Sequence, residues 1–320
     1  AGTLGFAAEV VNIWNVRAFN RRSKAFEVEW IGRQGDGSLV SIGPFAIANP
    51  VPVPSDHPQF HPEPLPQHKS SGNLVVTLEG FVSGIPAGDR EPSGKGDLLP
   101  KTTRLELAFN ENQNPSTNYR LQRLIVSDAT GNRWQPYFDH ARPRSNERVD
   151  GGTAILPGAL WPSEQAWKLE VEVLRHEYFA PEELWAPPPL PLDAGPRYLP
   201  LGHQFAAGSG SIQLANLVPP GLIASNQWQW TVRYWGNESN VFAVGVQFPE
   251  PMPNRRLLVV EATDDSGRAV PLVEHRGADH PQQALLFRPE PDATQLQLRL
   301  AVPELHRVEF LARPEFHPRK

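Results

Sequence analysis

The sequence contains no cysteine and a single methionine among its 320 residues. The lack of cysteine excludes disulfide frameworks, cysteine-ligated zinc sites and thiol nucleophiles. No apolar run approaches the roughly 18 residues that a membrane-spanning helix needs, so we expect no membrane span in this chain. Neither a P-loop nor a dinucleotide-binding glycine pattern is present, and we therefore expect no cofactor.

The sequence also lacks an excess of positive charge. Lysine and arginine number 30 against 35 aspartates and glutamates, which gives a formal net charge of −5. Binding to a phosphate backbone needs a concentrated basic surface, and the basic residues here are dispersed along the chain. We therefore expect no nucleic-acid partner.

Proline, in contrast, is abundant, with 35 residues. Each proline inside a helix removes a hydrogen-bond donor and clashes with the preceding turn, so a mostly helical chain is excluded. The prolines concentrate between 44 and 66 and again between 181 and 200. Such stretches favour an extended backbone and predict stiff connectors between domains.

The chain contains an internal similarity. Residues 105–136 resemble residues 244–271 in the order of their apolar runs and turns, and residues 161–173 match residues 288–300 without a gap. One supersecondary plan therefore occurs twice, which predicts two related domains.

Both copies show the period-two alternation of half-buried strands. The alternation predicts that Trp167, Leu169, Val171 and Val173 point inward in the first copy, and Leu296, Leu298 and Leu300 in the second. One buried and one wet face are typical of antiparallel sheets. The segments 128–131 and 264–267, each beginning with aspartate and ending with glycine, predict hairpin turns, with a calcium site as the alternative interpretation.

These patterns predict an all-β protein of tandem immunoglobulin-like or fibronectin-like antiparallel β-sandwiches with proline-rich connectors. We expect four segments: an N-terminal β segment with a linker at 1–66, a first sandwich at 67–186, a linker at 187–201 and a second sandwich at 202–320.

Histidines provide a candidate metal site. His57 and His61, with His68 nearby, lie in a proline-rich loop that also contains carboxylates, and imidazole and carboxylate groups are common metal ligands. The prolines hold the loop extended and separate the rings. A solvated linker is the competing interpretation, and the sequence favours it.

Aromatic residues provide a candidate ligand site. In 227–235, strand alternation places Trp228, Trp230 and Tyr234 on one face, where they form either a sandwich core or a platform for sugar rings. Trp235 points to the other face beside a Gly-Asn pair. We therefore take Trp235 as the candidate ligand-binding aromatic.

The sequence gives little support for catalysis. The carboxylate pairs Glu27 with Glu29 and Glu170 with Glu172 each lie on one strand face, whereas glycoside hydrolysis needs two carboxyl groups across a cleft. We interpret both pairs as solvated rows. The Gly-x-Ser-x-Gly pattern of a nucleophilic serine is absent. We expect a protein that is not an enzyme, and a hydrolase with a scattered site would need a deep pocket.

The N-terminal residues include an apolar stretch, 4–14, that precedes a strand-like segment at 25–31. We expect this stretch to dock onto its own chain or onto a neighbouring chain. The predicted function is a non-catalytic structural, adhesive or assembly protein that is extracellular, at the cell surface or periplasmic. Its expected partner is another protein or a copy of itself. A carbohydrate-binding module or an accessory domain of a secreted hydrolase, with a polysaccharide partner, is the alternative.

Overall fold

The computed structural model describes residues 19–33, 38–54, 56–86, 101–135, 149–150, 152–193, 199–220, 241–249, 252, 254–277 and 280–317. Within these residues the prediction of an all-β protein is confirmed: strands form several antiparallel sheets, and the one helical segment is the short 3-10 turn η2 (Pro181–Glu183). In the same residues, no helix has the length and apolar character needed to span a bilayer.

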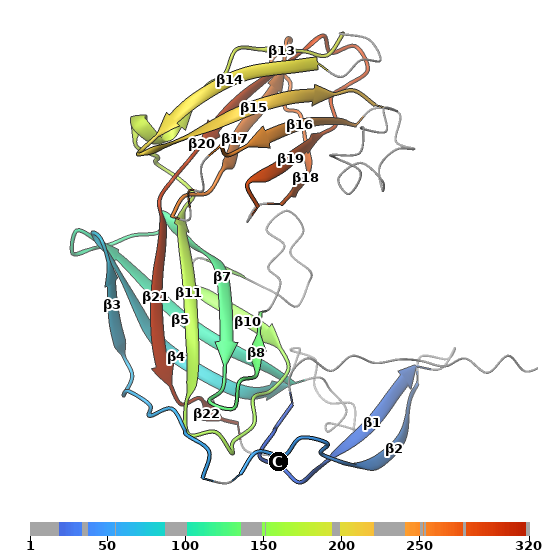
Figure 1. The fold of residues 1–320 in the computed structure, drawn as a ribbon, viewed down its shortest axis with the longest axis vertical. Helices are drawn as coiled ribbons and strands as arrows, with labels where there is room; N and C mark the ends of the chain where they lie inside the picture. Colours follow the sequence, from blue (N-terminus) through green and yellow to red (C-terminus); the bar gives the residue numbers. More distant parts are fainter. Residues whose placement is uncertain are drawn as a thin grey trace, which may run out of the picture.

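The first group of strands forms two sheets around one hydrophobic core (Figure 1). The larger sheet has the order β3 (Gln67–Ser71), β4 (Leu74–Pro86), β5 (Lys101–Glu111), β10 (Thr153–Pro157), β9 (Val149–Asp150). The short strands β6 (Asn114–Pro115) and β22 (Glu315–Phe316) pair with β5 and β4. The other sheet has the order β21 (Leu305–Ala312), β11 (Trp167–Arg175), β7 (Tyr119–Ser127), β8 (Arg133–Trp134).

The second group of strands surrounds a separate core. Its larger sheet has the order β14 (Leu199–Ala207), β15 (Gly210–Val218), β16 (Phe242–Gln247), β19 (Gln282–Phe287), β18 (Leu272–Arg276). In its smaller sheet β20 (Gln295–Ala301) pairs with β17 (Leu258–Asp264) on one side and with β12 (Leu184–Trp185) and β13 (Leu190–Pro191) on the other.

The predicted alternation is confirmed in both groups. The four predicted inward residues of β11 and the three of β20 are all buried, and they belong to the first and the second core respectively. Gln295, Gln297 and Arg299 of β20 are exposed. Burying a large apolar side chain contributes about 1.5 to 3 kcal/mol, so these stripes hold each pair of sheets together.

The end of the chain differs from its expected place. Residues 305–316, assigned by chain order to the second domain, pair with the first group: β21 runs antiparallel to β11, and β22 runs parallel to β4. The physical reason is burial, because Val308, Phe310 and Ala312 complete the first core. The chain thus returns to the first group after building the second.

The described parts of the expected linker, 187–193 and 199–201, are also incorporated into the second group. Leu190 is fully buried and pairs with Leu296 of β20, and β14 begins at Leu199. Proline-rich backbone is already extended, so it adds to a sheet edge wherever its neighbours include an apolar anchor such as Leu190.

The remaining strands, β1 (Ala25–Arg33) and β2 (Leu39–Ala48), form a separate two-stranded antiparallel sheet that projects from the base of the first group (Figure 1). The strand-like segment predicted at 25–31 is therefore confirmed. The apolar stretch at 4–14 lies outside the described residues.

Candidate functional site

The β1–β2 hairpin has one apolar face. Its register pairs Phe26 with Ile47 and Val28 with Phe45. The register then shifts at a bulge in β2 and continues with Trp30 opposite Ile42. Side chains directly opposite each other share a face, and so do alternate positions along a strand. The bulge sets Gly43 and Pro44 opposite one residue of β1 and keeps this alternation in phase. The resulting hairpin face consists of Phe26, Val28, Ile42, Phe45 and Ile47.

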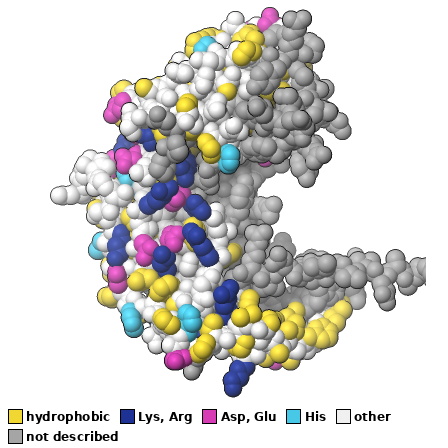
Figure 2. All heavy atoms as spheres, viewed as in Figure 1, with side chains coloured by type: hydrophobic (Ala, Val, Ile, Leu, Met, Phe, Trp, Pro, Cys, Tyr) yellow, Lys and Arg dark blue, Asp and Glu magenta, His cyan; other side chains and the backbone are white. Residues whose placement is uncertain are grey.

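The hairpin face is open to solvent. Val28, Ile42, Phe45 and Ile47 are 41%, 50%, 54% and 42% exposed, and the space-filling view shows a continuous apolar band over this part of the molecule (Figure 2). Neighbouring Val51 is 64% exposed. Isolated surface hydrophobics are ordinary, whereas a contiguous patch marks a contact surface.

Within the described residues, Phe19 packs against Phe26 with ring centroids 5.9 Å apart, while Val28, Ile42, Phe45 and Ile47 stay exposed. β1 and β2 pair only with each other there, so both outer edges remain unpaired. A lone two-stranded hairpin is marginally stable in water, and unpaired edges invite strand addition. Its fold therefore depends on what holds its base and on what covers its apolar face.

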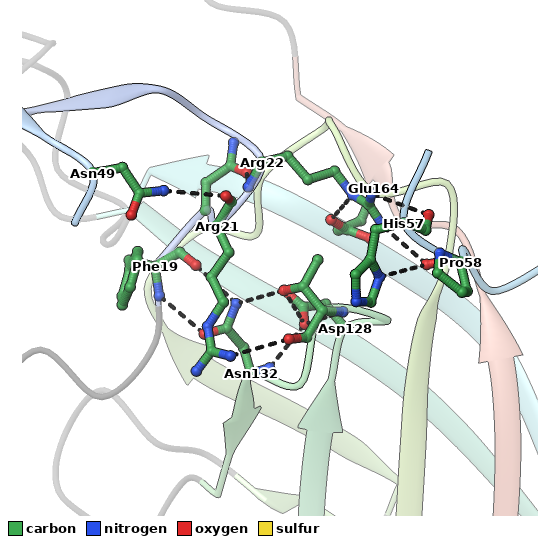
Figure 3. Close-up of polar contacts among 11 residues, drawn as sticks. Phe19, Arg21, Arg22, Asn49, His57, Pro58, Asp128, Asn132 and Glu164 are labelled. Carbon is green, nitrogen blue, oxygen red and sulfur yellow. Dashed lines mark hydrogen bonds and ion pairs between the residues drawn. The ribbon is translucent and has the colours of Figure 1, made fainter. Parts of the chain in front are cut away.

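A buried ion pair holds the base of the hairpin (Figure 3). Arg22 Nε donates to Glu164 Oε1 at 2.6 Å, and the two side chains are only 8% and 1% exposed. The same guanidinium donates to the carbonyl oxygens of His57 at 3.3 Å and Pro58 at 3.1 Å. One arginine thus joins the hairpin base to two separate loops.

Asn49 closes the hairpin where β2 ends. Its amide donates to the carbonyl oxygens of Arg21 at 3.1 Å and Ser23 at 2.7 Å, and its side-chain oxygen accepts the Val51 amide at 3.0 Å. Asn49 is itself buried, and its backbone amide bonds to Lys24. These bonds lock the two ends of the hairpin together.

A rigid turn of the first group receives the chain that leads into the hairpin. Asn132 exchanges two hydrogen bonds with the backbone of Phe19, donating at 2.8 Å and accepting at 3.5 Å. Arg21 Nη1 donates to the Thr130 carbonyl at 3.1 Å. Figure 3 shows these contacts converging on one side of the turn. We call Arg22, Asn49, Asn132 and Glu164 the hairpin anchor.

Asp128 makes this turn rigid. Its Oδ1 accepts the backbone amides of Thr130 and Asn132, both at 2.9 Å, and its Oδ2 accepts the Asn132 side chain at 2.6 Å. Gly131 adopts a φ of +91°, which favours glycine. Both carboxyl oxygens are engaged with donors of the turn, which is the geometry of the predicted turn rather than of a calcium site.

The predicted site residues have separate outcomes. His57 lies in the loop at the hairpin anchor, where its Nδ1 is 3.2 Å from the Pro58 carbonyl, while the His61 side chain is exposed. In the described ranges, no three histidine, aspartate or glutamate side chains are grouped to hold a metal ion. Trp235 lies outside the described residues.

The carboxylate row of β11 differs from the predicted solvated row. Glu172 is buried, because Arg307 Nε lies 2.9 Å from its Oε1 and Arg123 and Arg256 lie 3.8 and 3.7 Å away. Arg256 comes from the second group of strands. The expectation is therefore wrong for Glu172, which lies at the junction between the two groups.

A cluster of polar side chains lies at the start of β7, around the buried Tyr119. The Tyr119 hydroxyl donates to Glu111 at 2.9 Å and accepts from Arg175 at 2.9 Å, and Arg175 also pairs with Glu111. Burial, together with the hydrogen bond to Glu111, raises the pKa of Tyr119 to about 12. This cluster joins β5, β7 and β11 and supports the core.

Compared with known proteins, the chain matches no family model, no curated protein sequence and no solved structure. The sequence could indicate the strand-like segment 25–31 but not the hairpin anchor. Arg22 and Glu164 are 142 residues apart, and no local pattern links them.

Proposed function

We propose that this chain is a non-catalytic structural or assembly protein that binds another protein through its hairpin face. The supporting observation is an uncharged face, exposed at Val28, Ile42, Phe45 and Ile47 and half-buried at Phe26, on a hairpin with a buried polar anchor. A buried ion pair is costly to desolvate and adds little stability, so its use here favours a role in fixing geometry. The anchor ties the hairpin to the first group while Val28, Ile42, Phe45 and Ile47 stay exposed.

We infer that the rest of the chain is a scaffold of two sandwiches that arose by duplication. In support, the order β3-β4-β5-β10-β9 in the first group corresponds to β14-β15-β16-β19-β18 in the second. The facing sheets correspond as well, since β11 lies beside β7 as β20 lies beside β17. These correspondences follow the internal similarity of the sequence.

The two aspartate turns support the same inference. Asp264 Oδ1 accepts the backbone amides of Ser266 and Arg268, both at 2.9 Å, as Asp128 does two and four residues ahead of itself. Burial opposes ionisation of Asp264, but the hydrogen bonds from Arg268 and Ser266 outweigh it and lower its pKa. The turns differ at the residue four positions after the aspartate, which is the buried Asn132 in one and the exposed Arg268 in the other. Only the asparagine turn receives the hairpin.

The two groups of strands also meet at a junction that the chain crosses twice. The neighbour of β11 opposite β7 is β21, from the end of the chain, whereas the corresponding neighbours of β20 are β12 and β13. The segment 254–256 contacts 303–305 by backbone hydrogen bonds at the same junction. Two chain crossings with these contacts favour a spacer of fixed geometry, which suits a structural role. Sandwich domains of this kind are common at cell surfaces, and we propose a location outside the cytoplasm.

A photo-crosslinking amino acid placed at Phe45 in the source cells tests the proposal. Position 178 is the matched control, because Tyr178 is 77% exposed and lies outside the hairpin. We expect a discrete protein adduct from position 45 and none from position 178. Equal adduct patterns at the two positions, or no adduct at position 45, would overturn the proposed function.

A further inference from the structure

We propose that the partner of the hairpin face is a second copy of this chain, packed face to face about a two-fold axis. This inference rests on the proposed function, since it names the partner of the same surface. The contact is isologous, which means that both copies use the same surface, and Phe45 lies near the two-fold axis.

The chemistry of the face limits its partners. All five side chains of the hairpin face are hydrocarbon, and Glu27 lies at the alternate position, on the opposite side of the ribbon. A surface without charge suits another surface without charge, because any charged group placed against it would lose its water without gaining a partner. A copy of the hairpin face meets this requirement with no repulsive contact.

The rest of the described surface offers no alternative apolar face for self-association. Outside the hairpin and Val51, the large exposed hydrophobics in the described part of the chain are Tyr178 and Val260. Tyr178 follows β11, while Val260 lies within β17 of the other group. Two isolated side chains in different groups do not form a patch. Within the described surface, an apolar contact between copies therefore pairs hairpin with hairpin, and such a contact closes as a dimer instead of extending as a filament.

A membrane surface is the competing occupant of an apolar hairpin. The formal net charge of −5 opposes approach to anionic lipid. Membrane-associated amphipathic elements typically combine their apolar face with a strongly basic one, and Glu27 lies on the polar side of this ribbon. These observations favour the protein partner.

The size of the face sets the expected affinity. With about 200 Å² for a large apolar side chain, the exposed fractions of the hairpin face correspond to roughly 400 Å² per copy. Stable complexes bury about 800 Å² per partner, and contacts well below that are weak. The expected dimer is therefore reversible, with a Kd on the order of micromolar or weaker.

The position of Phe45 makes the geometry testable. Phe45 pairs with Val28 within the ladder, beside the bulge and between the two ends of the face. In a two-fold contact, a residue near the axis meets its own copy. Two sheets packed face to face lie about 10 Å apart, which is too far for a direct disulfide. A bismaleimide of about that span would instead join single cysteines at this position in two chains, and the sequence has no other cysteine to interfere.

The test uses the full chain with Phe45→Cys, and with Tyr178→Cys as the matched control, treated with the bismaleimide over a range of protein concentrations. We expect a crosslinked species of twice the 35.6 kDa chain mass for position 45 and little for position 178. In sedimentation, Phe45→Glu should weaken dimer formation at least about tenfold, while Tyr178→Glu leaves it unchanged. An unchanged far-UV circular dichroism spectrum shows that the variants are folded.

Three results would overturn the inference: a wild-type chain that stays monomeric at all concentrations, equal crosslinking yields at the two positions, or a monomer that floats with phosphatidylcholine and phosphatidylglycerol vesicles through Phe45. If the purified chain is monomeric while position 45 crosslinks a different protein in cells, self-pairing fails and the proposed function stands. If position 45 also crosslinks nothing in cells, both fail.

Discussion

Arg22 and Glu164 form an ion pair of 2.6 Å that is almost completely removed from solvent. Arg22 lies in the segment that leads into β1, and Glu164 lies in the loop before β11, so the pair joins these two segments. Because both side chains have little contact with water, removing one partner leaves the other charge largely uncompensated.

Glu164→Gln should release the base of the hairpin. We expect a loss of about 3 kcal/mol in the free energy of unfolding of the first group, because the Arg22 guanidinium stays buried without a counter-charge. Hydrogen exchange of the 25–48 amides should accelerate. The matched control is Glu63→Gln, which removes an exposed ion pair to Lys69 and should cost less than about 1 kcal/mol. Equal effects of the two variants would show that the buried pair does not fix the hairpin.

Phe310→Ala tests the place of the C-terminal strand. Phe310 is fully buried in the first core, so its truncation should destabilise that core by about 3 to 5 kcal/mol. Trp161 and Trp167 pack in this core with ring centroids 4.8 Å apart, and hydrogen exchange of the β11 amides reports its unfolding separately from that of the second core. Leu298→Ala is the control for the second core. Loss of the second core in the Phe310 variant, with the first intact, would contradict the topology.

The two aspartate turns can be compared directly. Asp128→Ala removes the acceptor of the Thr130 and Asn132 amides and should cost about 2 to 4 kcal/mol, because several buried donors lose their partner. It should also loosen the hairpin, since Asn132 binds Phe19. Asp264→Ala should destabilise the second group without affecting hairpin exchange. Faster hairpin exchange in the Asp264 variant would contradict the assignment of the anchor to the first turn alone.

Local patterns in the sequence predict the strands but not their distant partners. The alternation of β20, with Leu296, Leu298 and Leu300 buried, follows from period-two spacing because each residue's side of the sheet is a local property. The place of β21 beside β11 depends on which edge remains open after both groups have formed. The alternation of apolar and polar residues in β21 itself would fit a strand of either group.

The hairpin anchor and the burial of Glu172 escaped sequence analysis for a related reason. Glu172 alternates as a solvent-facing residue of β11, and it is buried only because Arg307 and Arg256 come from segments far along the chain. Likewise, the exposed apolar face of the hairpin is indistinguishable in sequence from a core strand. Whether a second layer covers a strand is decided by the tertiary structure.

The raised pKa of Tyr119 predicts that the folded chain loses stability at alkaline pH. Its pKa in the folded chain is about 12, above the usual value near 10, so between these values the unfolded chain ionises first and is favoured. The Tyr119 contribution is fully present below about pH 10 and is lost as the pH rises towards 12. The difference in 295 nm absorbance between the wild type and Tyr119→Phe should titrate near 12. A midpoint near 10 would contradict the buried geometry.

The most direct test of the central claim, that the hairpin face is the contact surface, is carbene footprinting of the protein in cells and in dilute purified form. In the dilute form Ile42, Phe45 and Ile47 should be labelled strongly, in keeping with their exposure. We predict that in cells the labelling of these three side chains falls severalfold while that of Tyr178 is unchanged. Equal labelling of the hairpin face in the two preparations would contradict the account.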